Sequence, residues 1–287
     1  MTDKDSGLKK GLGLKARRAI AYMVLALISV LCLFWFYVLI INATRGHSDI
    51  IIGFSAIPGT KLLDNWTNVL NGTLPLWEGM RNSVIVSVCS AALSVYFSAM
   101  TAYAIHAYDF KGKNVAFKFI LMVMMIPTQV TALGFLQLVQ NMEMEDNFIP
   151  LIVPAIAAPV TFFYMKQYME SSLPLEIIEA ARIDGSNEFR TFNTIIIPLM
   201  KPAIAVQAIF TFVSSWNNYF LPSLILHEAE MKTLPILIAQ LRSADFMKFD
   251  LGQVYVTIAF SIVPVIIMYL ILSKNIVEGV AAGGVKG

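Results

Sequence analysis

Residues 19–41 of the chain read AIAYMVLALISVLCLFWFYVLII, a run of 23 residues without a charged side chain. An α-helix rises about 1.5 Å per residue, so this run can span the roughly 30 Å hydrocarbon core of a bilayer. Lys15, Arg17 and Arg18 precede it directly. A secretory signal peptide has a shorter apolar core of roughly 7–15 residues and a small-residue cleavage site, which is not evident here. We therefore expect a retained membrane anchor.

The whole chain has the same apolar character. Of its 287 residues, 57% are hydrophobic and 14% are charged, and the mean hydropathy is +0.69. An average soluble domain has about 45–50% apolar and about 25% charged residues, so the excess apolar surface must face lipid. This composition excludes disordered, nucleic-acid-binding and disulfide-framework proteins. The two cysteines, Cys32 and Cys89, both lie inside apolar runs.

Five further stretches are apolar and long enough to cross a membrane, at about residues 83–105, 117–139, 149–168, 203–226 and 254–273. The sequence therefore predicts an all-α membrane protein with six transmembrane helices. Pro150, Pro154 and Pro159 interrupt the fourth stretch. Prolines are tolerated in a membrane helix where neighbouring helices satisfy the freed carbonyl groups. We expect this helix to be interior and kinked.

The distribution of Lys and Arg predicts the orientation of the spans. With the N-terminus inside, the inner segments hold 15 Lys and Arg residues and the outer segments hold 6. Inner loops of membrane proteins carry the excess of positive charge. We expect a cytoplasmic N-terminal tail of residues 1–18, a single six-span domain of residues 19–273, and a cytoplasmic C-terminal tail of residues 274–287.

The inner segment of residues 169–202 is long and patterned. Pro174 suits the first turn of a helix and Gly185 suits its C-terminal stop. Between them, one shared face carries Ile177, Ile178, Ala181 and Arg182, while charge comes from Glu176, Glu179 and Asp184. The pattern predicts a short helix lying along the cytoplasmic face.

A second short helix is expected directly after the first. Ser186 can cap it, with Phe189 and Phe192 pointing inward, and Pro198 and Pro202 mark the entry into the fifth span. The result is a helix–turn–helix. From the residues alone, two interpretations stay open: an amphipathic surface helix resting on lipid headgroups, or a docking site for another protein.

The spacing within this loop decides between the two interpretations. It carries Glu179-Ala180-Ala181, three residues, Gly185, nine residues, Ile195, one residue, Ile197 and Pro198. This pattern resembles the EAA signature, E-A-A-x3-G-x9-I-x-L-P, of the permeases of binding-protein-dependent ABC importers. Only Ile197 departs from it, in place of leucine, which conserves the side-chain volume.

The resemblance extends over about residues 17–287. It is closest to permeases of carbohydrate uptake: the maltose-permease G subunit and its relatives for multiple sugars, lactose and arabinose oligomers. The resemblance implies the six-span fold of a type I ABC importer permease. Further motifs occur in the family's order: Asn82-Ser83, Pro127 with Gln129, Trp216-Asn217-Asn218, Leu234-Pro235, and Gly279 to Gly287.

The resemblance also implies partners and a location. In the family, one permease works with a second homologous permease, two copies of an ABC ATPase and an extracytoplasmic solute-binding protein, in the bacterial cytoplasmic membrane. ATP and Mg would be bound by the ATPase, and this chain would carry no cofactor and no catalytic site. Consistently, the sequence contains no G-x(4)-G-K-[ST] phosphate loop. Lipids are the remaining partners, and nucleic acid is not one.

By resemblance, the first helix of the loop docks onto the ATPase. Glu179 would supply a charged contact, Ala180 and Ala181 would permit close packing, and Gly185 would allow the turn that follows. An alternative role for Glu179 is merely to solubilise the helix. The remaining members of the expected ATPase-coupling set are Asp184, Ile195 and Pro198.

Polar and aromatic residues within the spans are candidates for the solute path. Hydroxyl and amide groups can bind a hydroxylated solute, and aromatic faces can cover its apolar surface. The alternative is interhelical packing, since buried hydroxyls and amides commonly bond between helices. No ionisable side chain falls well inside a span, which favours a neutral solute such as a sugar. The candidates are Gln129, Tyr164, Ser214, Trp216, Asn217 and Asn218.

Other functions remain as alternatives. An ion-coupled secondary transporter of a neutral solute would normally show membrane-embedded charge and inverted repeats, and neither is evident. A membrane enzyme would need clustered acidic, His or Ser residues at one face. The outer segments 44–81 and 227–253 are either the landing surface for a binding protein or plain connectors. The three histidines, His47, His106 and His227, are isolated and do not predict a metal site.

Overall fold

The computed structural model describes residues 4–243 and 249–284, and side chains from residue 13 to residue 275 within those ranges. All elements in this part of the chain are helical, which confirms the all-α prediction. The chain forms two compact units, residues 1–71 with 244–260, and residues 72–243 with 261–287. The outermost residues of the two predicted tails, 1–3 and 285–287, lie outside the described residues, as does Lys248.

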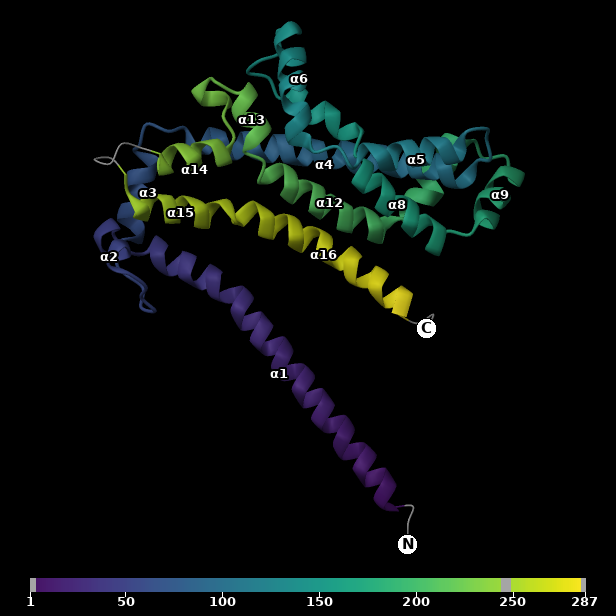
Figure 1. Cartoon of the computed structure of the whole chain (residues 1–287), viewed down its shortest axis with the longest axis horizontal. Coiled ribbons are helices and arrows are strands. Elements are labelled where there is room, and N and C mark those ends of the chain that lie inside the picture. The colour runs from purple at the N-terminus through teal and green to yellow at the C-terminus, as the bar shows by residue number, and fades with distance from the viewer. Residues whose placement is uncertain (1–3, 244–248, 285–287) are drawn as a thin grey trace. The chain divides into compact units, whose positions relative to one another are not determined.

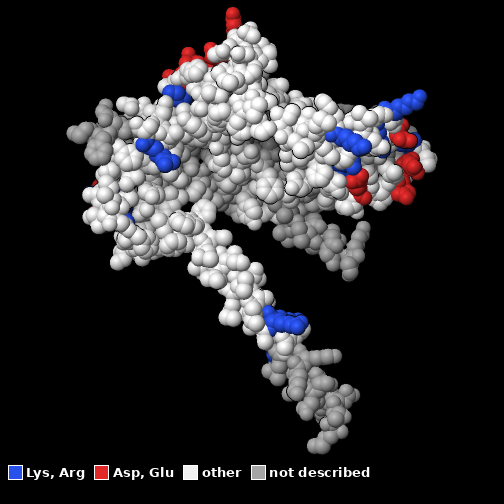
Figure 2. Space-filling view, viewed as in Figure 1, with Lys and Arg blue, Asp and Glu red and all other residues white. Residues whose placement is uncertain are grey.

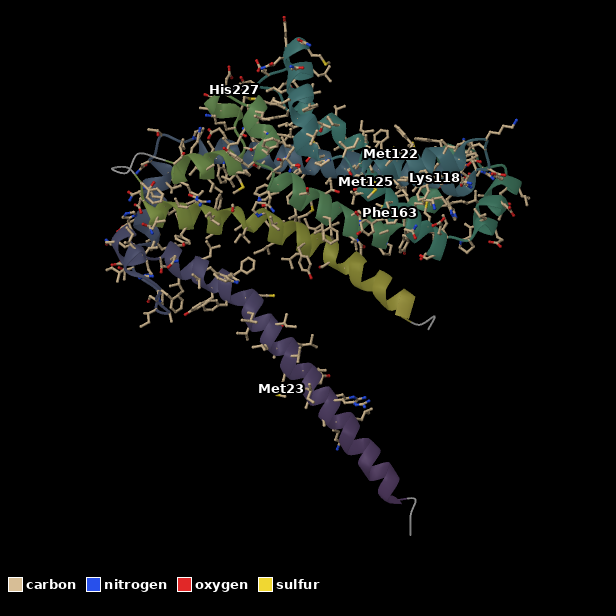
Figure 3. All side chains as sticks on the ribbon, in the orientation of Figure 1. Met23, Lys118, Met122, Met125, Phe163 and His227 are labelled. Atoms are coloured by element: carbon tan, nitrogen blue, oxygen red, sulfur yellow. The ribbon has the colours of Figure 1, made fainter. Side chains whose placement is uncertain are left out.

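The first unit holds the N-terminal anchor. The stretch Gly13–Ala43 of α1 is long and apolar enough to span a membrane, and only 6% of its most apolar window is buried. Met23 lies on this exposed helix (Figure 3). Asn65 donates to the carbonyl oxygens of Ala43 and Arg45, both at 2.9 Å, and so ties the end of α1 to α3. The helices of this unit are α1 (Lys4–Ala43), α2 (His47–Ile52), α3 (Leu62–Leu70) and α15 (Leu251–Ser261).

The second unit is built around the long helix α4 (Leu76–Ala107), which packs against α8 and α12, while α12 also packs against α16 (Figure 1). The helix α9 lies beyond the Ala107 end of α4 and α14 packs at its Leu76 end (Figure 1). The other helices of this unit are α5 (Lys113–Val123), α6 (Thr128–Asn141), α7 (Ile149–Ile152), η1 (Val153–Ile156), α8 (Pro159–Ser172), α9 (Leu175–Ile183), α10 (Glu188–Thr191), the π-helical turn η2 (Phe192–Ile196), α11 (Ile197–Leu199), α12 (Lys201–Trp216), α13 (Phe220–Ile225), η3 (Ala229–Met231), α14 (Leu234–Arg242) and α16 (Val263–Gly284).

Small side chains let the neighbouring helices approach α4 closely. Five serines recur every three or four residues along one stripe of α4, and all are buried: Ser83, Ser87, Ser90, Ser94 and Ser98. Small residues at helix interfaces in membranes allow backbones to approach, and hydroxyls bond across the interface. Ser94 accordingly donates to the Thr161 hydroxyl of α8 at 3.3 Å.

Two of the six predicted spans are strongly bent. Four segments are long and apolar enough to cross a membrane without a sharp bend: Gly13–Ala43, Leu76–Ala107, Ile149–Ser172 and Leu251–Asn275. The predicted span 117–139 is instead two helices, α5 and α6, that meet at 94°. The break ends at Pro127, whose ring and missing N–H prevent a continuous helix. Beyond it, α6 rises away from α5 (Figure 1), and Met122 and Met125 are exposed beside the break (Figure 3).

The fourth and fifth spans also contain breaks. The fourth passes from α7 through η1 to α8, with Pro150, Pro154 and Pro159 near the three helix starts, so the predicted kink is confirmed. The predicted span 203–226 is wrong as one continuous helix, because α12 ends at Trp216 and α13 begins at Phe220. A further bend of 82° separates Glu188–Leu199 from Lys201–Trp216.

A small apolar cluster supports α6 on α13. Val139 of α6 packs with Ile225, Leu226 and Ile236, all of them buried. Asp146, in the loop after α6, donates its backbone N–H to the Ile225 carbonyl at 3.0 Å. Figure 2 shows acidic side chains at the far end of α6 and a group of both signs around α9. The loop after α6 is therefore acidic, whereas the region around α9 carries charges of both signs.

Candidate functional site

The helix α9 begins and ends at the residues that the sequence predicts. Pro174 precedes its first residue with φ −63° and ψ 140°, and Ile183 is its last residue. Gly185 follows with φ +77°, a left-handed conformation that side chains with a Cβ disfavour. The turn after α9 therefore requires glycine.

One face of α9 is buried in the protein's own core. Ile178 is 1% exposed and Ala181 is 5% exposed. Ile178 belongs to a cluster with Met169, Leu173 and Phe192. This core joins α9 to the end of α8 and to η2, so a displacement of α9 must be transmitted to both.

The opposite face of α9 is open. Glu179 and Ala180 are exposed, and Ile183, 86% exposed, continues this face to the end of the helix. The expectation that both alanines form a surface patch is wrong, because Ala180 and Ala181 are about 100° apart around a helix and only Ala180 faces outward. Leu175 adds a further exposed apolar side chain at the start of α9.

The second short helix also differs from its prediction. Asn187, and not Ser186, caps α10, accepting from the Arg190 backbone N–H at 2.8 Å. Phe192 is buried as expected, whereas Phe189 is 68% exposed and was wrongly predicted to point inward. Since the helix begins later than the sequence suggests, Phe189 lies on its outer side. Phe189 joins Leu175 and Ile183 as exposed apolar side chains that sequence reasoning missed.

A polar network fastens the loop to the end of α4. The Arg182 Nε donates to Glu188 Oε1 at 2.7 Å, and the Tyr103 hydroxyl donates to Glu188 Oε2 at 2.6 Å. The Arg182 guanidinium also lies over the Tyr108 ring, 5.2 Å from its centroid. The hydrogen bond from Arg182 lowers the pKa of the Glu188 carboxyl below its ordinary value. One carboxylate thus links α9, α10 and α4.

The remaining coupling candidates have different environments. Asp184 is exposed and follows the last residue of α9. Ile195 is half-buried against the core of Ile178. Pro198 lies in α11, directly before the bend into α12. Asp184 is therefore accessible together with Glu179 and Ala180, while Ile195 and Pro198 hold the shape of the loop.

The predicted solute-path residues do not come together. A pocket of about 250 Å³, which we call the α6–α12 pocket, is lined by polar Thr128, Thr131, Ser215 and Asn218 together with apolar residues of α4, α6, α7 and α13. Of the six candidates only Asn218 lines it. Trp216 is 3% exposed and stacks on Phe212 at 5.7 Å between ring centroids, which is a packing role. Gln129, Tyr164, Ser214 and Asn217 are exposed.

A second polar pocket, the α13–α14 pocket, also borders α13. It measures about 370 Å³. Residues 219, 223 and 226 line it, whereas residues 218, 221 and 222 line the α6–α12 pocket. The segment that contains α13 therefore contributes to both pockets. The lining residues of the α13–α14 pocket are Tyr219, Ser223, Leu226, His227, Lys232, Ile236, Ala239, Gln240 and Ser243.

The chain leading into α14 is fixed to the end of α4. Asn82 donates through its amide nitrogen to the carbonyl oxygens of Glu230 at 2.7 Å and Lys232 at 3.1 Å. The Leu234 backbone N–H donates to the Ser83 hydroxyl at 2.8 Å. These contacts give the Asn82-Ser83 motif a structural role that sequence reasoning did not assign.

A glycine lets α14 itself pack against α4. A Cβ on Gly79 would lie 2.4 Å from Leu237 Cδ1, and Leu237 is fully buried. A side chain at this position would therefore force the two helices apart.

A charged side chain is buried among the packed helices of the second unit. Lys166 of α8 is 9% exposed, pairs with Glu170 and lies 4.4 Å from the Phe117 ring centroid. It lines neither polar pocket. Within residues 4–243 and 249–284, no group of three or more His, Cys, Asp or Glu residues is placed to hold a metal ion.

The fold and these sites define a polytopic α-helical transport protein, with an accessible helical loop at one end of α4 and polar pockets near the other. The family model described as "Binding-protein-dependent transport system inner membrane component" matches residues 94–280, and the chain belongs to this family. The resemblance drawn from the EAA-like loop is thus confirmed. The chain is a transport component of the bacterial inner membrane.

The chain is similar to several curated permeases. It is 33% identical over 267 residues to the arabinooligosaccharides transport system permease protein AraQ of Bacillus subtilis (strain 168), covering 91% of this chain and 93% of the relative. It is 34% identical to AraQ of Halalkalibacterium halodurans, covering 80% and 81%. It is 28% identical to the sn-glycerol-3-phosphate transport system permease protein UgpE of Escherichia coli (strain K12), covering 86% and 90%.

A solved structure has the same fold. It is a crystal structure of a bacterial ABC transporter involved in the import of the acidic polysaccharide alginate. One of its chains aligns with a TM-score of 0.76 and 21% sequence identity, covering 91% of this chain and 96% of that chain.

Proposed function

We propose that the chain is the permease subunit of an ATP-driven importer of an oligosaccharide. It forms half of the translocation path, beside a second homologous permease, and receives the solute from an extracytoplasmic binding protein. Two copies of a separate ATPase bind ATP and Mg and drive transport. Family membership and the AraQ relatives support this assignment and disfavour an ion-coupled secondary transporter.

The proposal includes an orientation. The α9 end of α4 faces the cytoplasm together with both chain termini, and the α14 end faces outward. The excess of Lys and Arg in the segments assigned to the inside supports this orientation. The acidic loop with Glu143, Glu145 and Asp146 then lies outside.

The coupling role is supported by one observation: α9 has an open face and a buried face. Glu179, Ala180 and Ile183 are accessible to another chain, while Ile178 and Ala181 are locked into the core. An ATPase that binds the open face moves α9, and the buried face transmits that motion to α8 and η2. The Glu188 carboxylate transmits it to α4. A rigid helix between two packed elements converts subunit closure into helix movement in this way.

The substrate class rests on chemistry and similarity together. The α6–α12 pocket presents hydroxyl and amide groups and no ionisable side chain. Such a lining suits a neutral, hydroxylated solute. AraQ, the relative with the higher identity, is named for arabinooligosaccharides, whereas UgpE is named for a phosphorylated solute.

The test is a pull-down of the tagged chain from detergent-solubilised native membranes, comparing wild type with Glu179→Lys. We expect wild type to capture a homologous permease and an ATPase, and the variant to lose the ATPase alone. Glu143→Lys is the matched control, because it reverses an exposed glutamate in the loop after α6. A chain that captures no ATPase, or equal capture by Glu179→Lys, contradicts the proposed coupling role.

A further inference from the structure

We propose that the α13–α14 pocket is an external subsite that binds one sugar unit of the incoming solute. This inference rests on the proposed function and extends it to a site that none of the predicted solute-path residues lines. The site is separate from the α6–α12 pocket and shares no lining residue with it.

The lining of the pocket matches the chemistry of a sugar. Hydroxyls come from Tyr219, Ser223 and Ser243, and an amide comes from Gln240. Ser223 and Ser243 donate to the backbone carbonyls of Phe220 and Gln240 and can accept from a sugar. The Tyr219 hydroxyl and the Gln240 amide can both donate and accept, as a sugar's hydroxyls require. His227, which lies beside α13 (Figure 3), adds a ring nitrogen.

Apolar residues complete the pocket. Leu226 and Ile236 are buried beneath it, and Ala239 contributes a small side chain. A sugar unit has an apolar C–H face besides its hydroxyl rim, and a ring such as that of half-exposed Tyr219 can cover that face. The volume of about 370 Å³ falls within the range of roughly 300–1,000 Å³ found for small-molecule sites.

Both walls of the pocket are held in place without a ligand. The α14 wall is fixed by the bonds of Asn82 and Ser83 described above. On the α13 side, the Asp146 Oδ1 accepts from the backbone N–H groups of His227 at 2.6 Å and Glu228 at 2.8 Å. A preformed pocket binds its ligand without the entropic cost of ordering its walls.

The charges near the pocket favour a neutral ligand. Lys232 lines the pocket, and no ion pair joins it to a carboxylate among the described residues. Outside the lining, the Glu145 carboxylate lies 3.8 Å from the His227 ring, and Glu228 follows in sequence. The Lys232 ammonium and these carboxylates offset one another, so the surroundings carry no excess charge that would select an ionic ligand, and the ammonium can donate to a neutral sugar's hydroxyl.

The two pockets share the segment around α13. Tyr219 and Ser223 line the α13–α14 pocket, while the neighbouring Asn218 lines the α6–α12 pocket. A solute bound in the α13–α14 pocket therefore contacts the same short segment that lines the α6–α12 pocket.

The test measures binding of free arabinotriose to the assembled transporter, this chain with its partner permease and ATPases, by saturation-transfer NMR. We expect Gln240→Ala and Tyr219→Ala each to weaken binding about five-fold, the value of one lost hydrogen bond or ring contact. The matched controls are Gln137→Ala and Tyr269→Ala, which remove the same groups from exposed positions outside both pockets.

The outcomes separate the subsite from the proposed function. Equal binding by the pocket and control variants, with import intact, overturns the subsite and leaves the function standing. Stronger competition by glycerol phosphate than by arabinotriose overturns the assignment of a neutral ligand. A wild-type transporter that imports no oligosaccharide from a loaded binding protein overturns the proposed function itself. Weaker binding by both pocket variants alone supports the subsite.

Discussion

The helices α9 and α14 have the same length, nine residues each, and lie near opposite ends of α4. Both begin beside a proline, Pro174 before α9 and Pro235 inside α14. They are fastened differently. Charged and phenolic side chains hold the α9 loop, whereas an amide, a hydroxyl and a glycine contact hold α14.

The two helices also differ in how much apolar surface they expose to their surroundings. The open face of α9 carries Ile183, one of the most exposed apolar side chains of the described chain. In α14, Leu234, Ile236 and Leu237 are all buried. Exposed apolar surface marks a contact with another protein or with the membrane. The comparison teaches that α9 keeps an open face, which we propose binds the ATPase, whereas α14 is a fixed wall.

Breaking the α14 contact should have the largest effect. Gly79→Leu places a side chain against fully buried Leu237 and should reduce the free energy of unfolding by about 1–3 kcal/mol, the usual cost of overpacking. Thermal unfolding of the detergent-solubilised protein measures this. Gly134→Leu is the matched control, because nothing lies within 4 Å of a Cβ at Gly134. Equal unfolding temperatures for the two variants would show that α14 is not packed against Gly79.

Substitutions of the two alanines of α9 test which face of the helix is buried and which is open. Ala181→Leu enlarges a buried side chain and should destabilise the protein by about 1–3 kcal/mol. Ala180→Leu enlarges an exposed one, so the free energy of unfolding should change by no more than about 0.5 kcal/mol, while ATPase capture is lost. Unfolding and pull-down measurements on both variants give the comparison. Loss of ATPase capture without loss of stability in Ala181→Leu would refute the assignment of the faces.

The Glu188 network should have the smallest effect on stability, since its ion pair with Arg182 is partly exposed. Glu188→Gln should leave basal ATPase activity unchanged and lower import stimulated by the binding protein several-fold. The pKa of Glu188 is lowered in the folded protein, so its stabilising effect is complete above the ordinary pKa of about 4.5 and is lost as the pH falls through the lower folded value.

The same variant provides a pH test of the network. The difference in unfolding temperature between wild type and Glu188→Gln should be constant from about pH 6 to 8 and shrink as the pH falls below the ordinary carboxyl pKa. A difference that grows on acidification would contradict a lowered pKa for Glu188. Asp184→Asn, at an exposed carboxylate beside the same turn, is the control.

Local signals in the sequence predicted much of the fold. Pro174 and Gly185 bound α9 as expected, because their backbone restrictions act within one turn of the chain. The bend at Pro127 was missed because apolar residues continue on both sides of it. Phe189 was misplaced because two neighbouring residues, Ser186 and Asn187, can both cap a helix, and tertiary packing selects between them.

The candidate site depends on contacts that composition does not reveal. Tyr103 and Glu188 are 85 residues apart, and no periodicity relates them. The α6–α12 pocket likewise forms from α4, α6, α7, η1, α12 and α13, which meet only after the breaks near Pro127 and Trp216. The sequence motif indicated Trp216 as a sugar contact, but its ring stacks on Phe212 and is buried in the helix packing.

The serine stripe of α4 has a consequence for biosynthesis. Ser94 bonds to Thr161, 67 residues later in the chain, and Asn82 bonds to the Glu230 carbonyl, 148 residues later. At a ribosomal rate of roughly 5–20 residues per second, synthesis of those 148 residues takes roughly 7–30 s. Polar groups that wait in lipid without partners are costly. The polar contacts of α4 are therefore completed only when the later segments of the chain have been synthesised.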